Sequence, residues 1–113
     1  MFGFGRAANQ PFETINGAEA AARVKAGARL VDVRERSEFS AGHVEGAINV
    51  PLSAFASHAH LIPKDAPVIL YCAAGMRSER ALGVCANLDL GVTTHVAGGI
   101  SALARAGMRI TQS

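Results

Sequence analysis

The fold is decided by PVILYCAAGMRS, residues 67–78, where the most apolar run of the chain passes directly into a cysteine. The run Pro67 to Tyr71 predicts a buried central strand. From residue 78 to 88 the sequence predicts a helix with one apolar side, formed by Ala81, Leu82, Cys85 and Leu88. The segment is therefore expected to form a strand, a tight loop and a helix, with Cys72 at the mouth of the loop.

On both sides of this segment, short apolar runs alternate with helical stretches. Further strands are predicted at 29–33, 47–50 and 93–97. Helices are predicted at 18–25, at 35–41 and at 100–106, and a further helix begins at Leu52 and ends before Pro63. Asn16 and Glu19 resemble a capping box for the first of them. This alternation predicts an α/β domain with a parallel sheet covered on both faces.

Length and composition limit the class of protein. A chain of 113 residues suffices for one domain, and 50% hydrophobic residues exclude extensive disorder. We expect a flexible N-terminal segment at residues 1–10 and one domain at 11–113. The net charge is +2, but nine Arg and two Lys are scattered without a basic run, so no nucleic-acid partner is expected.

No apolar stretch approaches the length of about 20 residues that crosses a bilayer, so no membrane partner is expected. The N-terminus MFGFGRAANQ lacks a signal-peptide pattern, which favours the cytoplasm. Two cysteines cannot form a disulfide framework. Cys85, with apolar neighbours at helical spacing, is interpreted as a core residue, whereas Cys72 is interpreted as a reactive thiol.

The loop after Cys72 is suited to holding a negative charge. Its backbone amides can point inward, and the following helix adds partial positive charge at its N-terminus. We expect these groups to lower the pKa of Cys72, so that much of it is ionised at neutral pH. Gly75 permits a positive φ angle in the tight loop.

The neighbouring residues complete a pocket for an anion. Ala73 and Ala74 are small enough to leave space for an incoming dianion. Arg77 can hold that dianion with a forked, permanently charged donor. Ser78 is expected to be the N-cap of the helix.

Six spaced motifs in this order resemble the single-domain rhodanese family: DVRE (32–35), EF (38–39), GHV (42–44), GAINVP (46–51), CAAGMRS (72–78) and GGI (98–100). The resemblance extends from about Thr14 to Met108 and is highly specific because several motifs occur in register. It departs from the family pattern at Leu103, where a Trp is often found.

This resemblance implies a three-layer domain with a central parallel sheet of about five strands, and thiosulfate:cyanide or related sulfurtransferase activity. Cys72 would be the nucleophile that carries sulfur as a persulfide. The donor would be a small anion such as thiosulfate, and the acceptor a thiol, cyanide or a protein thiol. Neither a metal nor an organic cofactor is implied. The persulfide would be held by the amides of the loop, which belong to Ala73, Ala74, Gly75, Met76 and Arg77, and Arg77 would orient the donor.

The first motifs are interpreted as support for the site. Asp32, Glu38 and His43 are expected to pair internally and brace the loop, since their spacing offers no proton path to Cys72. Arg34 either reaches the rim of the pocket or pairs with a carboxylate.

The remaining histidines are given no role in the site. His58 and His60, two apart on a predicted helix, do not face each other and are not expected to form a metal pair. His95 is expected to be exposed or satisfied locally.

Two alternatives to a sulfurtransferase remain open. The first is a non-catalytic or sulfur-relay module that delivers sulfur to a partner protein. The second is a phosphatase or arsenate reductase. Four residues separate Cys72 from Arg77, one fewer than in phosphatases with similar anion loops, which favours sulfur over the bulkier phosphate.

Overall fold

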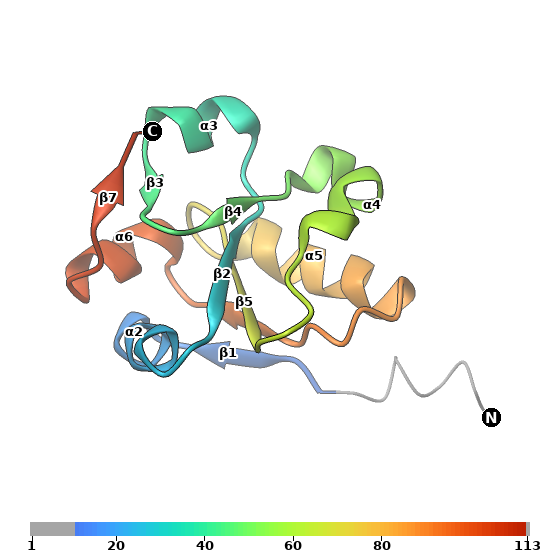
Figure 1. Cartoon of the computed structure of the whole chain (residues 1–113), viewed down its shortest axis with the longest axis horizontal. Helices are drawn as coiled ribbons and strands as arrows, with labels where there is room; N and C mark the ends of the chain where they lie inside the picture. The colour runs from blue at the N-terminus through green and yellow to red at the C-terminus, as the bar shows by residue number, and fades with distance from the viewer. Residues whose placement is uncertain (1–10, 113) are drawn as a thin grey trace.

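A computed structural model describes residues 11–112, which form a central sheet of five parallel strands. The strands Arg29–Asp32 and Val68–Tyr71 are short and largely buried, as expected for a sheet covered on both faces. The strand Glu13–Ile15 is mostly exposed, and the apolar pattern did not predict it. The central strand is β5 (Val68–Tyr71), as the apolar run at 67–71 predicted (Figure 1). The order across the sheet is β1 (Glu13–Ile15), β6 (Thr94–Val96), β5 (Val68–Tyr71), β2 (Arg29–Asp32) and β4 (Ile48–Asn49).

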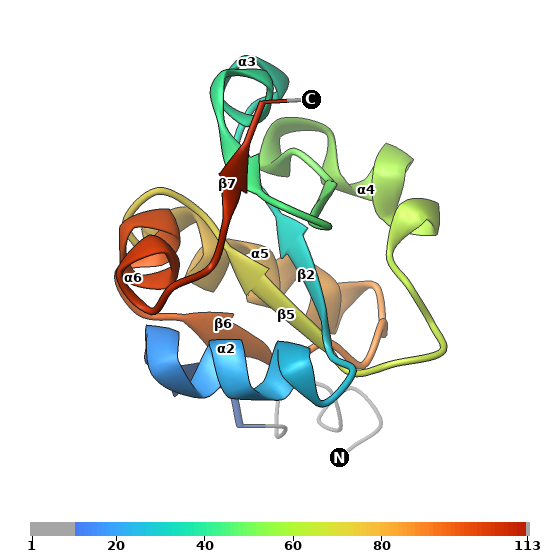
Figure 2. The ribbon, with the colours of Figure 1, turned by 60° about the vertical axis from the view of Figure 1, so that its left-hand side comes forward.

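Helices cover both faces of the sheet (Figure 2). On one face α2 (Gly17–Lys25) and α6 (Gly99–Arg105) contribute Ala20 and Leu103 to a core with Ile69 and Tyr71. On the other face α4 (Phe55–His58) and α5 (Met76–Asn87) pack on Val31 and Leu70. The predicted α/β fold with a five-stranded parallel sheet is therefore confirmed.

The capping residues of the helices follow the sequence in part. Asn16 is the N-cap of α2, and its side chain accepts a hydrogen bond from the Glu19 amide at 2.8 Å. A reciprocal capping box forms instead at α3 (Arg36–Ala41), between Glu35 and Glu38. Glu38, a member of the EF motif, is thereby fixed in the first turn of α3.

A second, two-stranded sheet was not predicted. It pairs β3 (His43–Val44) antiparallel to β7 (Ile110–Thr111), beside α3 (Figure 1). Each strand has only two residues, too few for an alternating pattern to show in the sequence. The pairing joins the segment after α3 to the end of the described chain.

The continuous helix predicted from Leu52 is wrong. The structure has three short pieces there: the 3₁₀ turn η1 (Leu52–Ala54), the helix α4, and the 3₁₀ turn η2 (Ala59–Leu61). Ala54 leaves helical geometry, at φ −135° and ψ 35°. Its carbonyl accepts hydrogen bonds from the Ser57 hydroxyl and the His58 ring, both at 3.0 Å, and such side-chain bonds compete with helix continuation.

Two expectations concern parts of the chain beyond the sheet. The flexible segment expected at residues 1–10 lies outside the described residues. Within residues 11–112, no helix has the length and apolar character that a membrane crossing requires.

Candidate active site

Cys72 follows β5 directly, at the carboxyl end of the central strand. The Gly75 amide donates to its Sγ atom at 3.0 Å, and the Ser78 amide donates at 3.3 Å. The thiol itself donates to Ser78 Oγ at 3.6 Å. The sequence predicted a thiol at the mouth of the loop, but Cys72 is only 1% exposed, because the loop and the first turn of α5 close around the sulfur.

These hydrogen bonds determine the acidity of the thiol. Burial by itself raises the pKa of Cys72, since a thiolate loses hydration inside the protein. The Ser78 hydroxyl and amide and the amides of Gly75 and Ala74 act in the other direction and outweigh burial. The net effect lowers the pKa of Cys72 below its ordinary value, in the direction expected from the loop.

Two glycines make this loop geometry feasible. Gly75 has φ +113° and is the N-cap of α5, a left-handed conformation that costs glycine little. Gly99, at φ +59°, lies against the backbone of the loop, where an added Cβ would clash with the carbonyl oxygens of Cys72 and Ala73. The Ile100 amide also donates to the Cys72 carbonyl at 2.9 Å. The start of α6 therefore packs against the backbone of the Cys72 loop and holds it in place.

Ser78 is not the N-cap that the sequence predicted. Because Gly75 takes that position, α5 begins at Met76, and Ser78 is the third residue of the helix. Its buried hydroxyl donates to the Gly75 carbonyl at 3.1 Å and lies 2.8 Å from His95 Nδ1. The side chain thus faces the sulfur rather than the end of the helix.

Arg77 and Glu38 form a two-point ion pair between α5 and α3. Their nitrogen–oxygen distances are 2.7 and 2.9 Å, and both side chains remain about one third exposed. The Arg77 guanidinium lowers the pKa of Glu38 to about 2. The pair fixes the guanidinium beside the loop while leaving part of it accessible to solvent.

The other loop residues differ in exposure. Ala74 is exposed and Met76 is 72% exposed, whereas Ala73 is half-buried. The outer surface of the loop is therefore formed by two small side chains and one flexible apolar one.

Asp32 and Arg34 form a buried ion pair at the end of β2. Arg34 donates to both carboxylate oxygens of Asp32, at 2.7 to 3.1 Å, and to the Gly42 carbonyl at 2.7 Å. Asn49 donates to the carbonyl oxygens of Asp32 and Arg34. Of the two options left open for Arg34, the structure shows pairing with a carboxylate. This network connects β2, β4 and the segment after α3.

His43 is also held within that segment. Its Nδ1 lies 2.8 Å from the Phe39 carbonyl, its ring stacks on the Phe39 ring at 3.6 Å, and it is 4% exposed. Among residues 11–112, no cluster of His, Cys, Asp and Glu side chains is arranged to hold a metal ion.

His95 is the residue of this site that sequence reasoning missed. It was expected to be exposed or satisfied locally, but it is 5% exposed, and its ring contacts Ser78 and, through Nε2, Thr14 Oγ1 at 3.1 Å. In a strand, neighbouring side chains alternate between faces, so His95 points to the face opposite Thr94 and Val96. The signal in the sequence was its position in the middle of a short strand leading into Gly98-Gly99.

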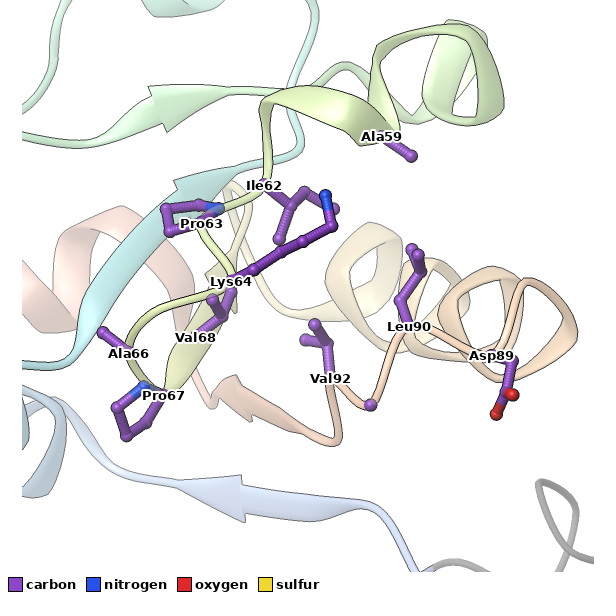
Figure 3. A pocket seen from close by; sticks show the side chains of 11 residues that line it. Ala59, Ile62, Pro63, Lys64, Ala66, Pro67, Val68, Asp89, Leu90 and Val92 are labelled. Carbon is purple, nitrogen blue, oxygen red and sulfur yellow. The ribbon is translucent and has the colours of Figure 1, made fainter.

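A separate cavity of about 310 Å³ lies at the other end of β5 (Figure 3). It lies beside Val68, the first residue of that strand, and none of its lining residues belongs to the Cys72 loop. The lining is mainly apolar, with Lys64 and Asp89 as its charged members. Its position separates it from the thiol chemistry.

Comparison with known proteins identifies the family of the chain. The family model of the Rhodanese-like domain matches residues 16–106. A protein named sulfurtransferase from Allochromatium vinosum is 35% identical over 81 residues, which cover 72% of this chain and 76% of that protein. The uncharacterized protein YqhL of Bacillus subtilis is 50% identical over 54 residues. That match covers 48% of this chain and 43% of YqhL, so the chain spans less than half of that relative.

Solved structures show the same architecture. A rhodanese-related protein from Thermoplasma volcanium superposes with a TM-score of 0.76 at 28% identity, covering 90% of this chain and all of that one. A Rhodopseudomonas palustris protein described as a possible tyrosine phosphatase gives a TM-score of 0.73 at 25% identity, covering 96% and 90%. With the family match over residues 16–106, these similarities show that the chain belongs to the rhodanese-like domain family.

Proposed function

We propose that this protein transfers sulfane sulfur, from thiosulfate or a related anionic donor to a thiol or cyanide acceptor, through a persulfide on Cys72. The observation that carries this proposal is the pair of amides, from Gly75 and Ser78, that point at Cys72 Sγ. Fixed amide dipoles stabilise a negative charge on sulfur without needing to reorganise during the reaction. Membership of a family that includes sulfurtransferases supports the same chemistry.

The reaction proceeds in two half-reactions. The Cys72 thiolate attacks the outer sulfur of thiosulfate, the sulfur–sulfur bond of the donor breaks, and sulfite leaves with the bonding electrons. An acceptor thiolate or cyanide then attacks the outer sulfur of the persulfide and releases Cys72 as a thiolate. This is covalent, ping-pong catalysis, in which the negative charge held by the enzyme is on a sulfur atom before and after each half-reaction.

Each of the other loop residues has a part in this proposal. Ala73 and Ala74 leave the approach to the sulfur free of bulky side chains, and Met76 continues the backbone cradle. Arg77 orients the anionic donor, while Glu38 fixes the guanidinium in place at 2.7 Å. Asp32, Arg34 and His43 hold the neighbouring segment. We also propose the cytoplasm as the place of action, because both cysteines are free and a reducing compartment keeps thiols available.

Phosphate chemistry is the second candidate, favoured by the description of the Rhodopseudomonas palustris relative. The loop argues against it, because only four residues separate Cys72 from Arg77. In this short loop the amides of Gly75 and Ser78 already converge on the sulfur atom itself. A tetrahedral phosphate needs a wider ring of donors than a single sulfur atom does.

The proposal is tested by intact-protein mass spectrometry after treatment with thiosulfate, using wild-type protein and the Cys72→Ser variant. We expect one added sulfur atom on the wild type and none on the variant, and we expect cyanide to remove the added sulfur as thiocyanate. A parallel incubation with an aryl phosphate should release no phosphate. Phosphate release without any sulfur adduct would overturn the proposal in favour of a phosphatase. A sulfur adduct that only a protein thiol can remove would identify a sulfur-relay module.

A further inference from the structure

A buried chain of hydrogen bonds leads from Cys72 to the edge of the sheet. Ser78 Oγ lies 3.6 Å from Cys72 Sγ and 2.8 Å from His95 Nδ1. On the other side of the ring, His95 Nε2 lies 3.1 Å from Thr14 Oγ1. Cys72, Ser78 and His95 are at most 5% exposed, whereas Thr14 is exposed. The four side chains therefore connect an enclosed thiol to solvent.

The sheet register explains why these groups line up. Thr14 and His95 are partners in the parallel pairing of β1 with β6, so their side chains lie on the same face of the sheet. Leu70 of β5 is the next partner of His95, on the face that α5 covers. The first turn of α5 places Ser78 between this face and the sulfur. Beyond Cys72, the path thus takes one side chain from each of α5, β6 and β1.

We propose that His95 is a positioning residue that passes the proton of the Cys72 thiol, through Ser78, to Thr14 at the edge of the sheet. This inference rests on the proposed function, since sulfur transfer begins with the loss of that proton. The enclosed thiol can then ionise without a water molecule entering the loop from the side on which the sulfur donor arrives.

The protons balance if the ring changes tautomer. The relay requires the Ser78 hydroxyl to turn from the Gly75 carbonyl, 3.1 Å away, and to donate to Nδ1 instead. With Cys72 as a thiol, Nδ1 is then the unprotonated nitrogen, and Nε2 carries the proton. On ionisation the Sγ proton moves to Ser78, the Ser78 proton moves to Nδ1, and the Nε2 proton passes to Thr14, which releases its own to water. His95 remains neutral and now donates from Nδ1 to Ser78, which leaves the Ser78 hydroxyl free to donate to the thiolate.

The surroundings of His95 favour the neutral ring that this relay requires. Burial lowers the pKa of His95, and the Glu79 carboxylate of α5 opposes this. On β5 the register partner of His95 is Leu70, which is apolar, and the Cys72 thiol reaches the ring through Ser78. On β1 the Glu13 carboxylate accepts hydrogen bonds from Arg23 and from Thr94, on the face opposite His95. Glu79 and Glu13, the two carboxylates named here, are both exposed to solvent.

The first test follows the ring nitrogens of His95 by ¹⁵N NMR while the pH is raised through the titration of Cys72. In the wild type we expect the Nε2–H tautomer while Cys72 is a thiol and the Nδ1–H tautomer once it is a thiolate. In Cys72→Ser the tautomer should not change over the same range. A His95 ring that keeps one tautomer while Cys72 titrates in the wild type would overturn the relay.

The second test measures the pH midpoint of Cys72 alkylation by iodoacetamide, resolved by peptide mass spectrometry. His95→Leu should raise the midpoint by about one pH unit, roughly a tenfold loss of thiolate at a fixed lower pH. His95→Asn, which can still donate to Ser78 from a similar position, should remain close to the wild type. Thr94→Val, which removes a hydroxyl on the opposite face, is the matched control and should leave the midpoint unchanged.

A wild-type midpoint in His95→Leu would contradict the proposal. Neither test uses thiosulfate, so the results can contradict the proton relay without contradicting the proposed sulfur transfer, and the reverse. A tautomer change and a shifted midpoint in a protein that never takes up sulfur would support the relay and overturn the proposed transfer. Sulfur uptake with an unresponsive ring would overturn the relay alone.

Discussion

The two cysteines lie in the same hydrophobic core and are equally enclosed, at 1% and 0% exposure, yet their acidities move in opposite directions. Burial raises the pKa of Cys85 to about 12, with no hydrogen bond opposing it. At Cys72, burial is outweighed by the Ser78 and Gly75 donors, and the pKa is lowered. Burial therefore does not decide whether a thiol of this protein is inert. The direction of a few N–H and O–H groups decides it.

Replacing each cysteine by serine should give the largest difference between the two positions. Cys72→Ser should lower sulfur transfer by roughly a thousandfold or more, because it removes the proposed nucleophile, and should leave cooperative unfolding intact. Cys85→Ser should retain sulfur transfer but lower the free energy of unfolding by about 1–3 kcal/mol, since it places a polar hydroxyl in an apolar core where the thiol was. Thiocyanate formation and urea unfolding measure the two effects. The reverse pattern would show that the wrong thiol has been chosen.

Alkaline pH should separate the two thiols by their effect on stability. Because folding raises the pKa of Cys85 from 9.0 to about 12, its contribution is fully present below pH 9.0 and is lost as pH rises toward 12. At pH about 10.5, ionisation of Cys85 in the unfolded chain should lower the free energy of unfolding by about 2 kcal/mol. Urea unfolding of the wild type and of Cys85→Ala, at pH about 8 and about 10.5, measures this cost. Equal losses in both proteins would contradict the raised pKa.

Removing one donor should make Cys72 more like Cys85. Ser78→Ala deletes the hydroxyl that contacts the sulfur but retains the amide, so the pKa of Cys72 should rise and alkylation by iodoacetamide at neutral pH should slow by about three- to tenfold. Ser101→Ala, an exposed serine of α6, is the matched control. An unchanged alkylation rate in Ser78→Ala would mean that the amides alone hold the thiolate.

The smallest effect is expected from Arg77, whose charge interacts with Cys72. The pKa shift of Cys85 comes from burial and includes no such contribution from a cation. Arg77→Ala should slow alkylation by negatively charged iodoacetate about threefold more than alkylation by neutral iodoacetamide. The same variant should raise the KM for thiosulfate more than it lowers kcat. Equal slowing with both reagents would show that Arg77 acts on the loop geometry and does not attract the anion.

The sequence predicted most of the fold because local pattern and global architecture agree in this chain. The runs at 29–33, 47–50, 67–71 and 93–97 all became strands, each shorter than predicted by one to two residues. The helix expected from Leu52 failed because side chains of Ser57 and His58 satisfy the Ala54 carbonyl. The pairing of β3 with β7 joins segments far apart in the chain, and no local pattern encodes it.

The site was predictable where residue type decides the chemistry and not where geometry does. Cys72, Gly75 and Arg77 were predicted from their residue types, their spacing and the family resemblance, and the structure brings them together in one loop at the start of α5. The role of Ser78 depended on where α5 begins, which Gly75 sets with its positive φ angle. The position of His95 depended on the register of β6 with β1 and on the helix packed above it. Neither can be read from one segment of sequence.

The register of Thr14 with His95 also has a consequence for how the chain folds during synthesis. Strand β1 pairs with β6, and the contacting residues Thr14 and His95 are 81 positions apart. During synthesis β1 therefore remains unpaired until β6 has been made. Such late closure of a parallel sheet slows folding. Protection of the β1 amides against hydrogen exchange should therefore be among the last signals to appear, and it would mark the moment at which the domain is complete.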